Sequence, residues 1–354
     1  MANRVSPGDK MSTLRKIGRE LGRVISPHHW GQKAALRLRQ LYAHTLLPEN
    51  KIRFDLDELG QVSGQTLVCF VSYAPSGLRP DTKAALQLMQ AKPETKVFLV
   101  SNCPLVVEDQ AWLEGQGLAY VATSNDGYDF GAYRKFVLSM LETDQAPERL
   151  VLTNDSFVFP LEAQALAPIL HDQTLGADFV GLIDQGKRGG RQRHFCSFYL
   201  SFSKAVVTSP PFQRFWRSLR PMPSRTYTIQ LGEKGLSQAL LKAGFSAETH
   251  FHKAGLIAAL KALETDQDRA DLIEALGISD LFTLAQWQAF QAAPWAQQLQ
   301  QVVRLVHGTE NLKLSALFTC FCGMPFVKTR NLREQGQLHA WYAARYPVIA
   351  DLKV

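Results

Sequence analysis

The sequence predicts an α/β protein built on a mostly parallel sheet. Four short apolar or β-branched blocks have the length and composition of buried strands, at residues 67–73, 96–101, 118–123 and 150–152. Helix-like segments at residues 81–90 and 106–116 separate the first three blocks. Strands and helices that alternate at this spacing favour a parallel sheet with helices on both faces. We expect this α/β domain to span residues 64–250.

Beyond Phe245 the hydrophobic pattern becomes helical. Four segments carry apolar residues spaced three and four apart, at residues 254–263, 269–276, 284–293 and 295–306. Gly277, Pro294 and Gly308 lie between or after these segments, where such residues break a helix. The pattern therefore predicts a helical subdomain with a closing segment over residues 251–354.

The first 60 residues predict a basic helical arm. Residues 1–47 hold nine Lys or Arg and two Asp or Glu, which accounts for the whole formal net charge of +7. One apolar helical stripe runs along the arm, formed by Leu14, Ile17, Leu21, Val24 and Ile25. Such a helix can lie on an anionic membrane surface, or it can pack its stripe on the rest of the protein. No basic motif interleaved with aromatic residues indicates a nucleic-acid partner.

Composition places the chain among ordinary globular proteins. Its 354 residues are 46% hydrophobic, enough for a substantial core. No run of about 18 apolar residues predicts a membrane span, and the N-terminus lacks the apolar core of a secretory signal. Five cysteines, an odd number, do not indicate a disulfide framework. We therefore expect a cytoplasmic protein, which the arm could hold on the inner face of the membrane.

The fourth predicted strand ends in a run of small polar residues. Thr153, Asn154, Asp155 and Ser156 follow the apolar block directly. Ligands of open α/β sheets bind beyond the carboxyl ends of the strands. A carboxylate there can hold Mg²⁺ or Mn²⁺ against the two phosphates of a nucleotide sugar, and Asp155 is the candidate. The alternative is that Asp155 and Ser156 only turn the chain or cap the next helix.

A second polar motif follows the third predicted strand. Asn125 and Gly127 lie just past the strand, and a helix is expected from Gly131 to about Leu141, directly after Asp129. Glycine lets the backbone approach a ligand closely, and the free amides of a helix start favour anions. These residues predict contacts to the donor phosphates. The alternative is an Asn-Asp-Gly turn with Asp129 as the helix N-cap.

These motifs, with others in the same order, resemble the rhamnan synthesis protein F family. The resemblance spans about residues 64–335 and rests on NDGYDFGAYR (125–134), NDS (154–156) with Pro160, RHFCSFYLSF (193–202), an aromatic cluster (212–216), EKGLSQALLKAGF (233–245) and GMPFVKTRNLR (323–333). Phe159 stands where the family has glycine, and the residues around His194 and Cys196 differ from its common form. The resemblance implies a GT-A-like nucleotide-sugar-binding fold.

The resemblance also implies an activity and its substrates. The implied reaction is transfer of a deoxyhexose, L-rhamnose from dTDP-rhamnose, to a glycan or lipid-linked glycan acceptor of cell-surface polysaccharide, with inversion at the transferred sugar. A rival interpretation is a catalytically silent GT-A-fold scaffold or glycan-binding subunit of a polysaccharide assembly complex. It arises because NDS offers one carboxylate where many GT-A enzymes present two.

Four further residues receive roles through the resemblance. Inverting GT-A enzymes carry their base near the start of a late helix, a position that Glu233 matches. The helix dipole alone also favours an acidic residue in a first turn. His194 is expected at the acceptor or diphosphate, or as a structural loop residue. Arg134 is expected at a phosphate, or else in an ion pair with a surface carboxylate. Lys328 is expected at the diphosphate, or else in solvent.

The aromatic cluster at residues 212–216 has two interpretations. Phe212, Phe215 and Trp216 could form a stacking platform for a sugar ring. Their three-and-four spacing is more typical of a helix stripe that faces the core. We expect the core-facing arrangement.

Overall fold

The computed structural model describes residues 53–354 except 144, 172–175, 187–192, 351 and 353–354. By its internal contacts the chain divides into two units, residues 1–51 and 52–354. The apolar stripe of the predicted arm and the nine basic residues among residues 1–47 lie outside the described residues. The predicted boundary near residue 250 stays a prediction, and only the second unit is described below.

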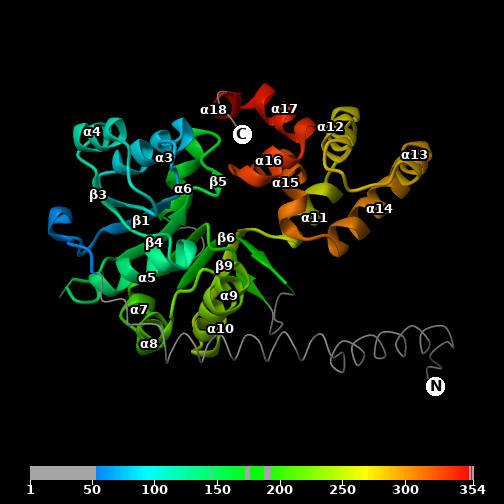
Figure 1. The fold of residues 1–354 in the computed structure, drawn as a ribbon. Coiled ribbons are helices and arrows are strands. Elements are labelled where there is room, and N and C mark those ends of the chain that lie inside the picture. Colours follow the sequence, from blue (N-terminus) through cyan, green and yellow to red (C-terminus); the bar gives the residue numbers. More distant parts are fainter. Residues whose placement is uncertain (1–52, 144, 172–175, 187–192, 351, 353–354) are drawn as a thin grey trace, which may run out of the picture. The chain divides into compact units, whose positions relative to one another are not determined.

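A central sheet confirms the predicted α/β class (Figure 1). Its strand order is β3-β2-β1-β4-β8-β6-β7, and β9 pairs with β6. The strands are β1 (Thr66–Ser72), β2 (Thr95–Ser101), β3 (Ala119–Ala122), β4 (Arg149–Asn154), β6 (Phe179–Gln185), β7 (His194–Phe195), β8 (Tyr199–Ser203) and β9 (Ala247–Phe251). The first four are parallel, and β8 is inserted antiparallel between β4 and β6. The sheet is therefore mostly parallel, as expected.

Helices connect the strands. The connections use α3 (Pro80–Gln90), α4 (Val107–Gly115), α5 (Tyr128–Met140), α6 (Leu166–His171) and α7 (Lys204–Val207), with short 3₁₀ turns at Asp57–Leu59 and Ala163–Ala165. Every residue of α5 from Phe130 to Met140 is buried. A helix that is apolar and buried on all sides lies inside the core, so the polar groups at its start are held rigidly.

The aromatic cluster lies in the core, as predicted. It belongs to α8 (Pro210–Ser218), where Phe212 and Trp216 are fully buried and Phe215 is half-buried. Trp216 stacks on Phe130 of α5, with ring centroids 5.7 Å apart. The cluster therefore fixes α5 beside α8.

The helix that carries Glu233 differs from the prediction. One helical run begins at Arg225, after the N-cap Ser224, and passes through α9 (Arg225–Tyr227), a π-helical segment (Thr228–Glu233) and α10 (Lys234–Lys242). Glu233 is therefore the last residue of the π-helical segment and does not open a helix. The expectation from the helix dipole does not apply to it, because that effect is confined to the first turn. π-Helical turns inside α-helices are frequent at functional sites.

The predicted helical region is confirmed. It contains α11 (Lys253–Lys261), α12 (Asp266–Gly277), α13 (Leu284–Ala292), α14 (Trp295–Gly308), a 3₁₀ turn (Asn311–Leu314), α15 (Ser315–Cys322), α16 (Thr329–Glu334), α17 (Gly336–Arg345) and α18 (Pro347–Ala350). Thr265 and Thr283 start α12 and α13 with capping boxes, which satisfy the first amides of each helix. Within the described chain, no helix has the length and apolar character needed to cross a bilayer.

A separate two-stranded ladder joins the closing segment to the residues that follow β4. β10 (Val327–Lys328) pairs antiparallel with β5 (Phe157–Val158), so that Lys328 lies opposite Phe157. Thr329 adds a hydrogen bond from its amide to the Ser156 carbonyl, at 3.1 Å. The closing segment is thereby held next to the polar residues that follow β4.

Candidate functional site

Asp155 is fixed at the carboxyl end of β4 by groups from β1. Ser72 Oγ donates to Asp155 Oδ2 at 2.6 Å, and the Tyr73 amide donates to the same oxygen at 3.0 Å. Arg79 Nη2 donates to the Asp155 carbonyl at 2.8 Å, and its guanidinium also pairs with Asp81. The parallel register of β1 and β4 brings these residues together, because it aligns Val71 with Asn154. Ser72 and Arg79 were not predicted from the sequence.

Asn154 connects the strand to the start of α5. Its Nδ2 donates to Asp129 Oδ2 at 3.1 Å and to the Tyr133 hydroxyl at 3.2 Å. Its Oδ1 accepts from the amide and the hydroxyl of Ser156, at 3.0 and 2.6 Å. The Asn154–Ser156 contact is the local turn described by the alternative interpretation. The Asn154–Asp129 contact unites the two predicted polar motifs.

The start of α5 has a backbone that requires glycine. Gly127 has φ 81°, and a Cβ there would lie 2.4 Å from Pro221 Cβ. A Cβ at Gly131 would lie 1.7 Å from the Asp126 carbonyl oxygen. Gly127 occupies the N-cap position, so the predicted capping role of Asp129 is not observed. Asp129 instead accepts from the Phe130 amide at 3.0 Å, and Asn125 lies half-buried between β3 and α5.

Tyr128, the first residue of α5, is held in an unfavourable conformation. Its φ is 56°, a region that bulky side chains rarely adopt, and its side chain is 40% exposed. Asn102, which directly follows β2, donates from Nδ2 to the Tyr128 carbonyl at 3.2 Å. Local backbone strain of this kind is found preferentially at functional sites.

A half-buried carboxylate pair, Asp129 and Glu233, lies beside these residues. Ser197 Oγ donates to Glu233 Oε1 at 2.8 Å, and the Ser197 carbonyl accepts from Tyr133 Oη at 3.0 Å. The π-helical segment approaches α5 closely, since a Cβ at Gly232 would lie 2.8 Å from the Phe130 ring. This contact places Glu233 near Asp129, the neighbour of Phe130. We call Asp129, Ser197 and Glu233 the carboxylate cluster.

Burial keeps both carboxyl groups of the cluster poised to take up a proton. The pKa of Asp129 is raised to about 6, mainly by burial and also by the nearby charge of Glu233, while the hydrogen bond from Ser197 opposes the shift. Burial also raises the pKa of Glu233, against the effects of Ser197 and the Lys328 charge. A carboxyl group that titrates near neutral pH is suited to general base catalysis.

His194 and Lys328 both lie near Glu233. His194 Nε2 is 3.9 Å from Glu233 Oε2, and its side chain is 12% exposed. Lys328 Nζ lies 5.6 Å from the centre of the Phe157 ring. Residues that are far apart in the sequence, from Asp129 to Lys328, therefore lie close together near β4. Neither Lys328 nor His194 is fully solvated, since both are half-buried.

Arg134 is placed differently from the other predicted donor residues. Its side chain is buried inside the core, and its Nε donates to the Trp216 carbonyl at 3.1 Å. This placement favours a packing role between α5 and α8. A phosphate contact from Arg134 stays a prediction.

The residues at Asp155 fit a metal ion only if phosphates complete its coordination. Among the described residues, no group of three or more His, Cys, Asp or Glu side chains is arranged to hold a metal ion. Asp155 offers one carboxylate, and its Oδ2 already accepts two hydrogen bonds. Mg²⁺ is commonly bound through one or two carboxylates together with substrate phosphates. Asp155 is compatible with metal binding through one carboxylate and the substrate phosphates.

Comparison with known proteins identifies relatives of the chain. The family model described as Rhamnan synthesis protein F matches residues 97–273. An uncharacterised protein, y4gN, of Sinorhizobium fredii is 26% identical over 209 residues, which cover 58% of this chain and 54% of the relative. The chain thus aligns with about half the length of this curated relative.

Solved structures that match the chain share little sequence with it. A mannosyltransferase of Pyrobaculum calidifontis, in complex with GDP-Man and Mn²⁺, is 14% identical with a TM-score of 0.31, covering 90% of this chain and 93% of that one. The glycosyltransferase GlyE of Streptococcus pneumoniae is 12% identical with a TM-score of 0.32, covering 69% and 64%.

Proposed function

Because the chain belongs to the rhamnan synthesis protein F family, we propose that it is a glycosyltransferase of GT-A-like architecture. Its proposed donor is a nucleotide sugar, dTDP-L-rhamnose, and its proposed acceptor is a cell-surface polysaccharide or its lipid-linked precursor. The observation that carries this proposal is the carboxylate cluster, which lies beside the polar carboxyl ends of β1 and β4.

Glu233 is the proposed general base. In an inverting transfer the acceptor hydroxyl oxygen bonds to the anomeric carbon while the bond from that carbon to the diphosphate oxygen breaks. The hydroxyl proton passes to Glu233, and the diphosphate leaves with the bonding electrons. Ser197 Oγ holds Glu233 Oε1 and acts as a positioning residue. Asp129, whose pKa is about 6, is the second group able to hold a proton in the cluster.

The remaining groups at the strand ends are proposed to bind the donor. Backbone amides around Gly127 and the polar side chains that follow β4 face the nucleotide diphosphate in this proposal, with His194 and Lys328 contributing positive charge or hydrogen bonds. The proposed donor-binding residues are Asn125, Gly127, Asp129, Arg134, Asn154, Asp155, Ser156 and Lys328. Asp155 would hold Mg²⁺ or Mn²⁺ together with the phosphates, and the ion would stabilise the charge of the leaving diphosphate.

A second function is supported by the single carboxylate at Asp155. Because Oδ2 is already occupied by Ser72 and Tyr73, a chain that binds no metal and transfers no sugar is a coherent alternative. Such a chain would act as a scaffold or glycan-binding subunit of a polysaccharide assembly complex. The two functions differ in whether nucleotide sugars bind and are cleaved.

Thermal unfolding against a panel of nucleotide sugars tests the proposal. A ligand at 100 times its dissociation constant stabilises the folded state by about 2.7 kcal/mol. We expect dTDP-rhamnose with Mg²⁺ to stabilise the wild type and to have a much smaller effect on Asp155→Asn. No stabilisation by any nucleotide sugar would favour the scaffold.

The N-terminal arm is proposed to hold the enzyme on anionic membrane. Each Lys or Arg near such a surface contributes about 1 kcal/mol, and salt screens this attraction within about 8 Å. Binding to anionic vesicles should weaken steeply with salt, and a chain starting near Pro48 should lose it. Equal vesicle binding by both forms would contradict the proposal. Insolubility of the shortened form would indicate that the apolar stripe packs on the core.

A further inference from the structure

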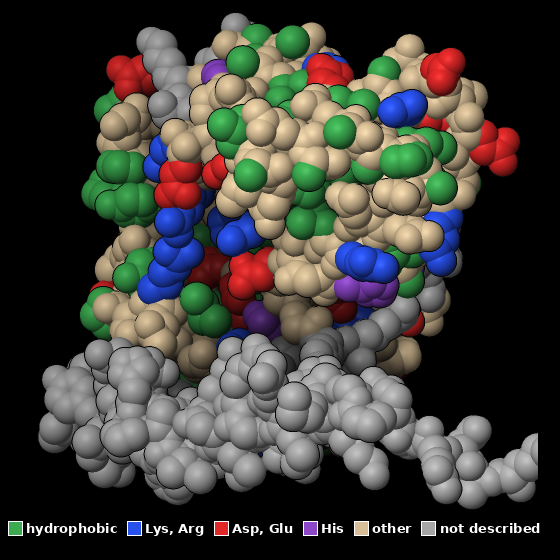
Figure 2. All heavy atoms as spheres, turned by 90° about the vertical axis from the view of Figure 1, so that its right-hand side faces the viewer, with side chains coloured by type: hydrophobic (Ala, Val, Ile, Leu, Met, Phe, Trp, Pro, Cys, Tyr) green, Lys and Arg blue, Asp and Glu red, His purple; other side chains and the backbone are tan. Residues whose placement is uncertain are grey.

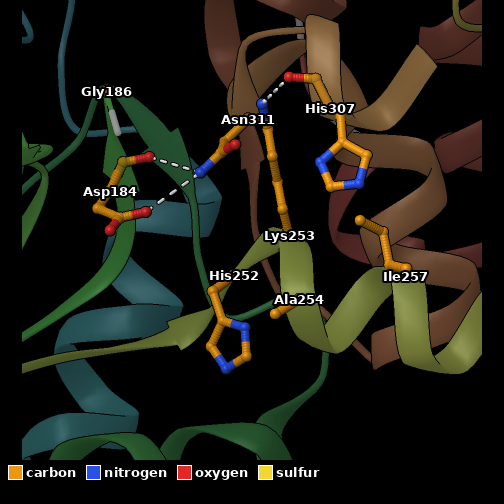
Figure 3. Close-up of a pocket in the computed structure, with 8 residues that line it drawn as sticks. All are labelled: Asp184, Gly186, His252, Lys253, Ala254, Ile257, His307 and Asn311. Carbon is orange, nitrogen blue, oxygen red and sulfur yellow. Dashed lines mark hydrogen bonds between the residues drawn. The ribbon is translucent and has the colours of Figure 1, made fainter. Parts of the chain in front are cut away.

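A pocket of about 410 Å³ opens at the carboxyl ends of β6 and β9 (Figure 3). This volume lies within the range of about 300–1,000 Å³ typical of small-molecule sites. The pocket is lined by Asp184, Gly186, His252, Lys253, Ala254, Ile257, His307 and Asn311. None of these residues belongs to the proposed donor site. Figure 3 shows Asp184 and Asn311 on one side, His307 and Ile257 on the other, and Lys253 between them.

The pocket lies on the same edge of the sheet as Asp155. β4 and β6 run parallel to each other, because both pair antiparallel with β8. Leu152 and Gly181 both align with Leu200. Asp155 and Asp184, each three residues further along, therefore stand at the same height of the sheet, two strand positions or about 10 Å apart. A few linked sugar residues can span such a distance.

The polar groups of the pocket are held in defined orientations. Asn311 Nδ2 donates to the Asp184 carbonyl at 2.7 Å and to its Oδ1 at 3.2 Å. His252 Nδ1 accepts from the Gly255 amide at 2.9 Å, so the neutral ring carries its proton on Nε2. Lys253 Nζ donates to the His307 carbonyl at 3.3 Å and has protons left for a ligand. The pocket thus offers both donors and acceptors.

Charges in and around the pocket are balanced. Asp184 Oδ2 pairs with Arg193 Nε at 2.7 Å, and both side chains are at most 10% exposed. Lys253 lies near the opposite charges of Asp184 and Glu310. On the face drawn in Figure 2, acidic and basic side chains are interspersed, and neither sign dominates. A site of this kind has no net field that would favour an ionic ligand.

We propose that this pocket binds an uncharged sugar residue of the acceptor glycan. Sugar hydroxyls both donate and accept hydrogen bonds, which matches the carboxylate, amide, imidazole and ammonium groups of the pocket. Ile257 and Ala254 provide an apolar wall for the C–H face of the ring. The inference rests on the proposed transferase function for the identity of the glycan as acceptor.

His252 and His307 allow the proposal to be tested by NMR on the full chain. We expect methyl α-L-rhamnoside, methyl α-D-glucoside and a rhamnose trisaccharide, at millimolar concentration, to shift the imidazole Hε1 resonances of both histidines. Methyl α-D-glucuronide, which carries a carboxylate, should shift them less. The proposal is overturned if the uncharged sugars leave both resonances unchanged, or if the glucuronide binds more tightly than they do.

A matched pair of variants separates the pocket from the surface of its helix. Ile257→Trp should fill the pocket and abolish the sugar-induced shifts. Ala258→Trp adds the same indole at an exposed position of α11 outside the pocket, and it should retain them. Loss of the shifts in both variants, or in neither, would contradict the assignment.

The same spectra distinguish failure of this inference from failure of the proposed function. dTDP-rhamnose should shift the resonance of His194 near Glu233 and leave His252 and His307 unchanged. Sugar binding at His252 and His307 without nucleotide binding would retain the pocket as a glycan site while contradicting the transferase. Nucleotide binding without sugar binding would contradict the pocket as a glycan site and leave the proposed transferase function supported.

Discussion

Two acidic regions on one edge of the sheet differ in how their charges are compensated. In the carboxylate cluster, Asp129 and Glu233 lie near each other, and burial raises the pKa of both groups. In the pocket, Asp184 is paired directly with the Arg193 guanidinium. Burial that raises the pKa of a carboxyl group suits it to take up a proton, whereas a carboxylate bonded to a guanidinium is suited to serve as a fixed binding group. The comparison separates a region suited to chemistry from one suited to recognition.

The largest expected effect is on turnover, through Glu233→Gln. Loss of a general base lowers the rate by about 10²- to 10⁴-fold. Donor affinity, measured by calorimetry, should stay near that of the wild type, because the substitution preserves shape and hydrogen bonding. Glu334→Gln, at an exposed surface ion pair, is the control and should keep full turnover. If Glu233→Gln loses donor binding while the bound complex still turns over, Glu233 is a binding residue.

The next effect is on stability, through Asp184→Asn. This change leaves the buried Arg193 charge without its partner, which typically costs about 3–5 kcal/mol in the free energy of unfolding. Chemical denaturation measures the loss. The double variant Asp184→Asn with Arg193→Gln should recover part of it, because no unpaired charge then remains. An unchanged midpoint for the single variant would mean that the pair is not isolated from solvent.

Asp129→Asn should change how the stability of the protein depends on pH. A carboxyl whose pKa is about 6 when folded and near 3.9 when unfolded binds more protons in the folded state between those values. Asp129 therefore destabilises the wild type as pH rises through about 6, by at most about 3 kcal/mol. Relative to the wild type, Asp129→Asn should gain stability from pH 5 to pH 8. A difference in unfolding free energy that is constant with pH would contradict the shifted pKa.

The smallest expected effect comes from Ser197→Ala. The Ser197 hydroxyl lowers the pKa of Glu233 through its hydrogen bond, so its removal should raise that pKa. The acid limb of the rate profile should then move up by about one pH unit. Turnover at pH values above this inflection should change little. If Ser197 had only a structural role, its loss would instead lower turnover across the whole pH range. Ser218→Ala, at an exposed position of α8, is the control.

Local patterns predicted most of the fold. The β1, β2, β3 and β4 blocks, and α11 to α14, were found because apolar periodicity and Gly or Pro breaks are local signals. The start of Glu233's helix was missed, since the π-helical segment Thr228–Glu233 interrupts the regular spacing. Asp129, Asn154 and Asp155 could be proposed from the sequence because they stand in compact motifs after strands.

Contacts between distant segments could not be predicted in the same way. The Asn311–Asp184 contact spans 127 positions, and the Ser72–Asp155 contact spans 83. Such contacts depend on strand register and helix packing, which no short window records. The pocket was missed for this reason, and so were Ser72, Arg79 and Ser197. Nor could the burial of Arg134 be predicted, because the contact of its side chain with the Trp216 carbonyl spans 82 positions.

Release of dTDP from dTDP-rhamnose tests the central claim most directly. The purified full chain would be incubated with the donor, Mg²⁺ and a membrane extract that supplies acceptor glycan, and dTDP would be measured by chromatography. The account predicts release by the wild type, strong reduction in Glu233→Gln and reduction in Asp155→Asn. Release that is absent from the wild type for every nucleotide sugar tested, or equal in all three proteins, would contradict it.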